Sequence, residues 1–104
     1  MNHDNQHNNS TANVSLQVLP SVASDQVYPV VDKVIELIAS SGVRYEVGPM
    51  ETTMEGDLDT LFEIVKKAQH LCIELGAGSV VSIVKIHYKP KGVTIDEKVG
   101  KYRR

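Results

Sequence analysis

The stretch that decides the fold runs from Arg44 to Asp57 and reads RYEVGPMETTMEGD. It contains two short runs with β-strand character, Arg44–Val47 and Thr52–Glu55, which are separated by Gly48-Pro49. Proline cannot donate a hydrogen bond to a strand ladder, and glycine adopts backbone angles that other residues avoid, so we expect the chain to turn there. The sequence therefore predicts a β-hairpin that leads directly into a helical pattern.

The second arm of this hairpin carries candidate ligand contacts. Alternate side chains of a strand point to the same face of a sheet, so Thr53 and Glu55 are expected to lie side by side. A hydroxyl next to a carboxylate suits a small polar ligand. A one-residue bulge at residues 48–50 would turn Thr52 to that face instead of Thr53, and both possibilities remain open at this stage.

The composition is that of one soluble globular domain, with 104 residues of which 41% are hydrophobic and 23% are charged. A formal net charge of −2 argues against a dedicated binder of nucleic acid or of an anionic membrane. No apolar run approaches the ~18 residues of a membrane-spanning helix. Cys72 is the single cysteine, so it cannot form an internal disulfide, and the cytoplasm is the expected location.

The first thirteen residues differ from the rest of the chain in composition. They contain almost no hydrophobic side chains, so residues 1–13 are predicted to be a disordered tail and residues 14–104 a single folded domain. The tail holds His3 and His7, but a metal site needs ligands in fixed positions. We therefore expect no metal site there.

Hydrophobic periodicity predicts the remaining elements. Asn13–Leu19 alternates between apolar and polar residues, as a half-buried strand does, and Ser79–Tyr88 predicts the longest strand. Apolar residues recur at helical spacing between Val27 and Ile38, and again between Leu58 and Leu75. The capping-box pattern Thr94-x-x-Glu97 predicts a short last helix.

The predicted order is β-α-β-β-α-β with an added C-terminal helix. Right-handed crossovers turn this order into an α+β fold, the ferredoxin-like sandwich, in which a four-stranded antiparallel sheet carries both helices on one face. The other face is left uncovered, and the expected side chains on it are Ser15, Gln17, Thr53, Glu55, Val81, Ile83, Lys85 and His87. Apolar Val81 and Ile83 are not expected to stay in water, so a second copy of the chain or a ligand should cover them.

Several functions lack their essential residues in this sequence. An acylphosphatase of this topology would need an arginine in the loop of residues 20–26, and a heavy-metal carrier would need two cysteines there; the loop has neither. An RNA-recognition domain would place aromatic residues on the strands that here carry Ser, Gln, Thr and Glu. No catalytic constellation emerges, so an enzyme is not expected. The alternatives left open are a small-molecule binding protein and a ligand-independent oligomeric module that uses the uncovered sheet face only for assembly.

The string Tyr45-x-x-Gly48-Pro49-Met50-x-Thr52-x-x-Glu55-Gly56-Asp57 resembles a motif of the small thiamine-binding family, whose members are ferredoxin-like proteins of about this size. The resemblance continues through Val80–Ile86 and Lys91–Lys98, and it covers the chain from about Val14 to Tyr102. One departure is His87-Tyr88-Lys89, which stands where the family carries an acidic, arginine-containing run.

The resemblance implies a non-catalytic protein that binds thiamine or its hydroxymethylpyrimidine half, as a carrier, buffer or sensor. It also implies a homodimer or homotetramer with the ligand near the subunit interfaces. Separately, we expect neither a metal nor any cofactor besides this ligand. An aminopyrimidine needs a paired donor and acceptor. The residues expected to contact the ligand are Ser15, Gln17, Thr53 (or Thr52 if the strand is bulged), Glu55 and Lys85.

Two of these expectations concern charge. Glu55 or the ring of Tyr45 would favour the positive thiazolium ring of thiamine. Glu55 also has a purely structural alternative, as an acidic residue that stabilises the N-terminus of the helix beginning at Asp57.

Overall fold

Strand β1 (Ala12–Pro20) lies in the interior of a four-stranded antiparallel sheet with the order β2-β3-β1-β4. The computed structural model describes residues 11–103, so most of the predicted tail, with His3 and His7, lies outside the described residues. Thr11, Ala12 and Asn13, which were predicted to belong to that tail, are part of the folded chain, and β1 begins one residue earlier than the predicted strand.

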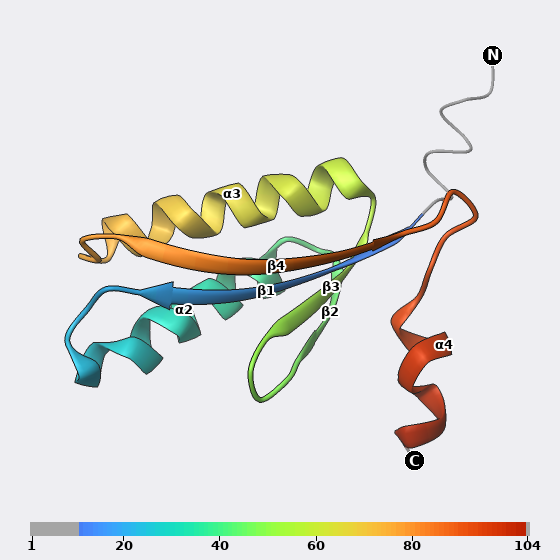
Figure 1. Cartoon of the computed structure of the whole chain (residues 1–104), viewed down its shortest axis with the longest axis horizontal. Helices are drawn as coiled ribbons and strands as arrows, with labels where there is room; N and C mark the ends of the chain where they lie inside the picture. Colours follow the sequence, from blue (N-terminus) through green and yellow to red (C-terminus); the bar gives the residue numbers. More distant parts are fainter. Residues whose placement is uncertain (1–10, 104) are drawn as a thin grey trace.

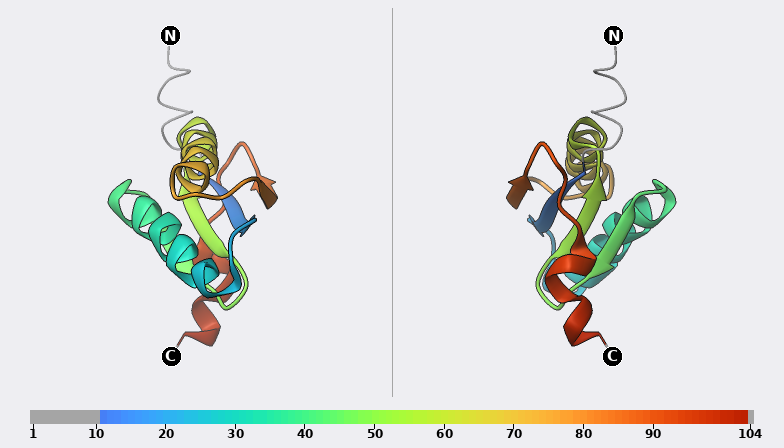
Figure 2. Two further views of the ribbon diagram at one scale, coloured as in Figure 1. Left: turned by 90° about the vertical axis from the view of Figure 1, so that its left-hand side faces the viewer. Right: turned by 90° about the vertical axis from the view of Figure 1, so that its right-hand side faces the viewer.

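The element order confirms the predicted α+β, ferredoxin-like fold (Figure 1). The elements are β1, a short 3-10 helix η1 (Ser24–Gln26), α2 (Val27–Ser40), β2 (Arg44–Val47), β3 (Thr52–Gly56), α3 (Leu58–Glu74), β4 (Val80–Tyr88), α4 (Ile95–Val99) and a 3-10 turn η2 (Gly100–Tyr102). Figure 2 shows α2 and α3 together on one side of the sheet. We call the opposite side the open face. Within residues 11–103 no helix is both long enough and apolar enough to cross a membrane.

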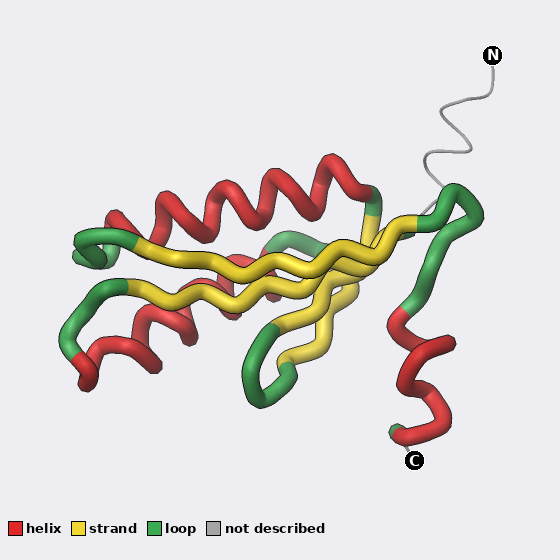
Figure 3. The backbone as a smooth tube through the Cα atoms, in the orientation of Figure 1, coloured by secondary structure: helices red, strands yellow, loops and turns green. Residues whose placement is uncertain are grey.

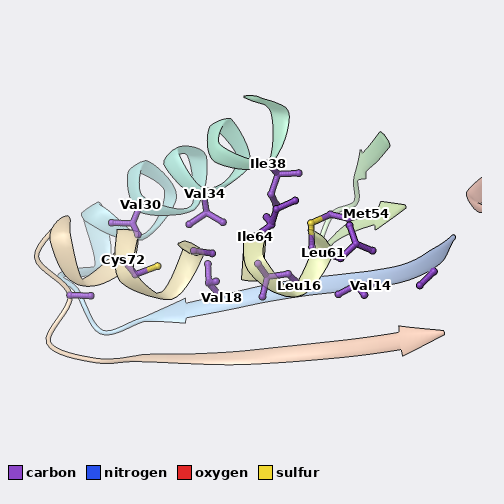
Figure 4. Close-up of a cluster of buried hydrophobic side chains, with 13 residues drawn as sticks. Val14, Leu16, Val18, Val30, Val34, Ile38, Met54, Leu61, Ile64 and Cys72 are labelled. Carbon is purple, nitrogen blue, oxygen red and sulfur yellow. The ribbon is translucent and has the colours of Figure 1, made fainter. Parts of the chain in front are cut away.

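The core lies between the sheet and the two long helices (Figure 4). Alternation along β1 sends its valines and Leu16 toward the helices, where they meet the apolar stripes of α2 and α3. The buried core residues are Ala12, Val14, Leu16, Val18, Val30, Val34, Ile38, Met54, Leu61, Ile64, Ala68, Cys72 and Ala77. Burying each large apolar side chain stabilises the fold by about 1.5–3 kcal/mol. The core therefore fixes which face of β1 is left for polar side chains.

The β2–β3 hairpin turns without a bulge in its strands. Glu46 pairs with Thr53, and Val47 pairs with Thr52, so the two arms stay in regular register. The Gly48 amide donates to the Glu51 carbonyl at 2.8 Å, and a Cβ on Gly48 would lie 2.9 Å from that oxygen, which leaves room for glycine alone. The regular register puts Thr53 on the open face and Thr52 on the helix face.

Helix α3 starts at a capping side chain and ends at a glycine. Asp57 occupies the N-cap, and its carboxylate accepts hydrogen bonds from the Thr60 amide at 2.9 Å and from the Thr60 hydroxyl at 2.6 Å. After the helix, Gly76 adopts a positive φ of 103°, which an L-residue with a side chain rarely adopts. The hairpin therefore leads into a helix whose two ends are both specified locally.

The C-terminal segment returns to the open face. Figure 3 shows the loop of residues 89–94 leaving the end of β4 and turning back toward α4. Val93 and Ile95 are buried, and Val93 exchanges hydrogen bonds with Thr11. The carboxylate of Glu55 accepts a hydrogen bond from the amide of Ile95, the first residue of α4. Glu55 thus stabilises a helix N-terminus, but that of α4 and not that of the helix after Asp57.

Two arginine–carboxylate pairs tie the C-terminal segment to β2. Arg44 donates two hydrogen bonds to Asp96, at 2.6 and 2.7 Å, and Arg103 donates to Glu46 at 2.8 Å. The hydrogen bond from Arg44 lowers the pKa of Asp96 below its ordinary value of 3.8, and the one from Arg103 lowers the pKa of Glu46 below 4.5. All four side chains are partly exposed, so these pairs orient the segment more than they stabilise it.

Removing the N-cap side chain of α3 tests whether Asp57 stabilises the start of this helix. We expect Asp57→Ala to lower the free energy of unfolding by about 1 kcal/mol, because the Thr60 amide loses its acceptor. Chemical denaturation measures the change. Asp59→Ala is the matched control, since Asp59 lies in the same first turn but is not the N-cap; an equal loss in both variants would contradict the capping role.

Breaking the Arg44–Asp96 pair tests how α4 is held. We expect Arg44→Ala to speed amide hydrogen exchange in residues 94–103 at neutral pH, while Lys33→Ala, which breaks an exposed pair on α2, leaves that exchange unchanged. A carboxylate whose pKa is lowered by folding stabilises the folded state until the pH falls through its folded-state pKa. As the pH is lowered, amide exchange in the wild-type segment, corrected for the intrinsic exchange rate, should therefore stay slow until the pH reaches the range in which carboxyl groups ordinarily titrate. It should become faster only at a pH below that range. Loss of protection already near pH 6 would contradict this mechanism.

Candidate functional site

A pocket of about 330 Å³ lies on the open face, between the sheet and α4. Its size is at the lower end of the range of about 300–1,000 Å³ that is typical of small-molecule sites. Strands β1 to β4, the hairpin loop and α4 all contribute to it. The lining residues are polar Asn13, Ser15, Glu46, Glu51, Thr53, Lys85, His87 and Lys98, with apolar Ile86, Ile95 and Val99.

Strand register builds the floor of this pocket. Ser15 of β1 lies opposite Thr53 of β3 on one side and opposite Lys85 of β4 on the other. Directly paired residues of an antiparallel sheet point to the same face with about 5 Å between them. The three side chains therefore form one row across the open face.

A second, parallel row lies one step along β1. Asn13 pairs with Glu55 on β3 and with His87 on β4. At one end of this row the Glu55 carboxylate is bound to the amide of Ile95, so it holds α4 in place and is not part of the pocket lining. Asn13 and His87 remain directed at the pocket.

The floor contains buried polar atoms that have no hydrogen-bond partner among residues 11–103. They are both polar atoms of the Asn13 side-chain amide and the hydroxyl oxygen of Ser15. The two residues are only 4% and 6% exposed. Leaving a buried polar group without a partner costs about 1–3 kcal/mol, so native proteins satisfy nearly all of them. These atoms are therefore the strongest structural indication of a bound polar ligand.

The pocket wall carries charges of both signs. Lys85 pairs with Glu51 at 2.9 Å, and Glu46 accepts from Arg103 at 2.8 Å. Within residues 11–103, the side chains of Lys98 and His87 form no ion pair or hydrogen bond, although both line the pocket. The site thus combines two carboxylates, each with its own cation, and a separate group of basic side chains.

The structure brings together three of the six predicted contacts. Ser15, Thr53 and Lys85 line the pocket. Gln17 shares their face but lies beside a second hollow, of about 250 Å³, between α2 and the hairpin loop. Glu55 lies at the margin, where it binds α4.

The regular register decides the open alternative between Thr53 and Thr52, and the suggested contact from Tyr45 is wrong. Thr52 lies opposite Leu16 on the helix face and is buried there, because the hairpin has no bulge to shift its register. Tyr45 lies opposite Met54 on that same face, so its ring is not available to a ligand on the open face.

Sequence reasoning missed Asn13 and the charges contributed by the hairpin and by α4. Asn13 has the same parity as Ser15 in the alternation of β1, and this signal was hidden by the polar tail that precedes it. Glu46 lies in the predicted first arm of the hairpin, where no role was predicted for it. Glu51 and Lys98 lie outside the strands, so no periodic pattern indicated their direction.

Comparisons with known proteins agree with this fold. A UPF0045 protein of Clostridium perfringens is 71% identical over 93 residues, which cover 89% of this chain and 98% of that protein. A Bacillus cereus structure of a domain of unknown function, DUF77, is 55% identical with a TM-score of 0.85, and covers 90% of this chain and 91% of its own.

A third similar protein has a name that refers to a vitamin. It is a Thermotoga maritima structure named as a candidate thiamine biosynthesis/salvage protein, 40% identical with a TM-score of 0.84, covering 89% of this chain and 99% of its own. The family model described as thiamine-binding protein matches residues 14–103. The chain therefore belongs to the thiamine-binding protein family.

Proposed function

We propose that the protein binds thiamine or its hydroxymethylpyrimidine half in the pocket on the open face. The observation that carries this proposal is the buried, unpartnered amide of Asn13. An aminopyrimidine presents a ring nitrogen acceptor beside an exocyclic amino donor. An asparagine amide offers the complementary donor and acceptor, as it does when it pairs with the edge of adenine. Ser15 and Thr53 supply hydroxyls beside it.

The carboxylates of the wall suit the rest of thiamine. Its thiazolium ring carries a positive charge, and Glu46 and Glu51 line the same pocket. Their arginine and lysine partners approach from one side, so each carboxylate retains acceptor capacity. Ligand and wall are thus electrostatically matched at that end of the site.

The arrangement favours binding over catalysis. Ser15 is the pocket hydroxyl that is most deeply buried, and its oxygen has no base within hydrogen-bond distance among residues 11–103. A serine nucleophile needs such a base. We therefore propose the role of a carrier, buffer or sensor of the vitamin, and the cytoplasm as the place where the protein acts.

A second candidate function, assembly independent of ligand, rests on an apolar patch. Leu19, Val81 and Ile83 lie on the open face beyond the pocket, with 45%, 61% and 48% of their surfaces exposed. Apolar side chains that cluster on one face are typical of an interface between copies of a chain. We propose that a second copy covers this patch, as a homodimer or as part of a homotetramer.

Isothermal titration tests ligand binding. We expect both thiamine and hydroxymethylpyrimidine to bind the wild-type protein, and Asn13→Ala to weaken both by about 10- to 100-fold, because two buried hydrogen bonds are lost. Gln17→Ala is the matched control, since Gln17 shares the face but lies outside the pocket. No heat from either ligand at millimolar concentration would refute the proposal.

Light scattering tests the patch. We expect wild-type protein to be oligomeric and Ile83→Lys to be monomeric, because a charge in the interface would be buried without a partner. Ile73→Lys is the control: Ile73 is 49% exposed on α3, and it lies on the far side of the sheet. Assembly that persists in the Ile83 variant would rule out this interface.

A further inference from the structure

The basic side chains of the pocket are not accounted for by an aminopyrimidine and a thiazolium ring. Both of those groups are neutral or cationic, whereas Lys85, His87 and Lys98 all line the site. Lys85 is paired with Glu51, and Glu46 is paired with Arg103, which lies outside the lining, so among the described residues Lys98 is left as a surplus positive charge without a paired carboxylate, even with His87 neutral. A ligand that carried no negative charge would leave this surplus without a function.

The surplus is localised. Glu51 is occupied by Lys85 and Glu46 by Arg103, so the uncompensated groups are Lys98 on α4 and His87 on β4. These side chains approach from the roof and from the floor of one pocket. Two donors that converge from different elements are a common way to hold a phosphate.

The position of His87 specifies where that phosphate would lie. His87 is the direct strand partner of Asn13, so its Cα lies about 5 Å from that of the residue that we assign to the pyrimidine ring. An anion held there must be attached close to the ring. The hydroxymethyl arm of the pyrimidine places an ester phosphate one methylene and one oxygen from the ring, whereas the phosphate of thiamine monophosphate lies beyond the thiazolium ring.

We propose that the preferred ligand is the phosphate monoester of hydroxymethylpyrimidine. Asn13 and Ser15 bind the ring, and Lys98 and His87 bind the phosphate. This inference rests on the proposed function, because it assigns the ring to Asn13. It also gives α4 a direct role, since Lys98 then closes the pocket from above over a bound anion.

Titration of the full chain with four ligands tests the proposal: hydroxymethylpyrimidine, its phosphate, thiamine and thiamine monophosphate. We expect the pyrimidine phosphate to bind at least about tenfold more tightly than the free pyrimidine, and this preference to shrink as salt is raised. Thiamine monophosphate should gain little over thiamine. Inorganic phosphate should compete with the pyrimidine phosphate more strongly than with the free pyrimidine.

Two variants locate the effect. Lys98→Gln should remove most of the preference for the phosphate over free hydroxymethylpyrimidine. Lys67→Gln, the same charge change on an exposed residue of α3, should leave the preference intact.

The outcomes separate this inference from the proposed function. Equal affinity for the free and phosphorylated pyrimidine would overturn the inference alone, as would equal losses in the two lysine variants. An equal gain for thiamine monophosphate would also overturn it, because the phosphate would then lie away from the ring. Failure of all four ligands to bind would refute the proposed function itself.

Discussion

The constraint on which the structure depends is the double pairing of β1. This strand is bonded to β3 on one edge and to β4 on the other, and its side chains must alternate between two environments. Three apolar side chains, Val14, Leu16 and Val18, anchor one face in the core. A register shift by one residue would put them on the open face, so the hydrophobic effect fixes the positions of Asn13 and Ser15 as firmly as those of the core.

Much of the fold could be predicted because its determinants are local. Periods of two and of 3.6 residues identify the strands and the long helices, and handedness rules reduce the possible topologies to a few. The same alternation placed Ser15 and Thr53 correctly. The choice between Thr53 and Thr52 required the hairpin register, which depends on how Gly48 and Glu51 close the turn. No pattern within either strand contains that information.

The rest of the site depends on contacts between distant parts of the chain. The Arg44–Asp96 pair and the bond from the amide of Ile95 to Glu55 span 52 and 40 residues, and they place α4 over the sheet. A five-residue helix has too little apolar surface to reveal its docking face from periodicity. Lys98 therefore became visible as a pocket residue only in the folded chain. Asn13 was missed for a compositional reason, because it follows a run of polar residues and looks like their continuation.

The unpartnered atoms on the floor of the pocket also bear on the stability of the empty protein. Asn13 and Ser15 were removed from water when the chain folded, and within the described residues they received no hydrogen bonds in return. A shape-matched apolar floor would make the empty domain more stable and would make it unable to recognise a polar ring. The strand therefore carries a local deficit in its hydrogen bonding, which lowers the stability of the empty domain and which binding of the ligand that we propose would remove.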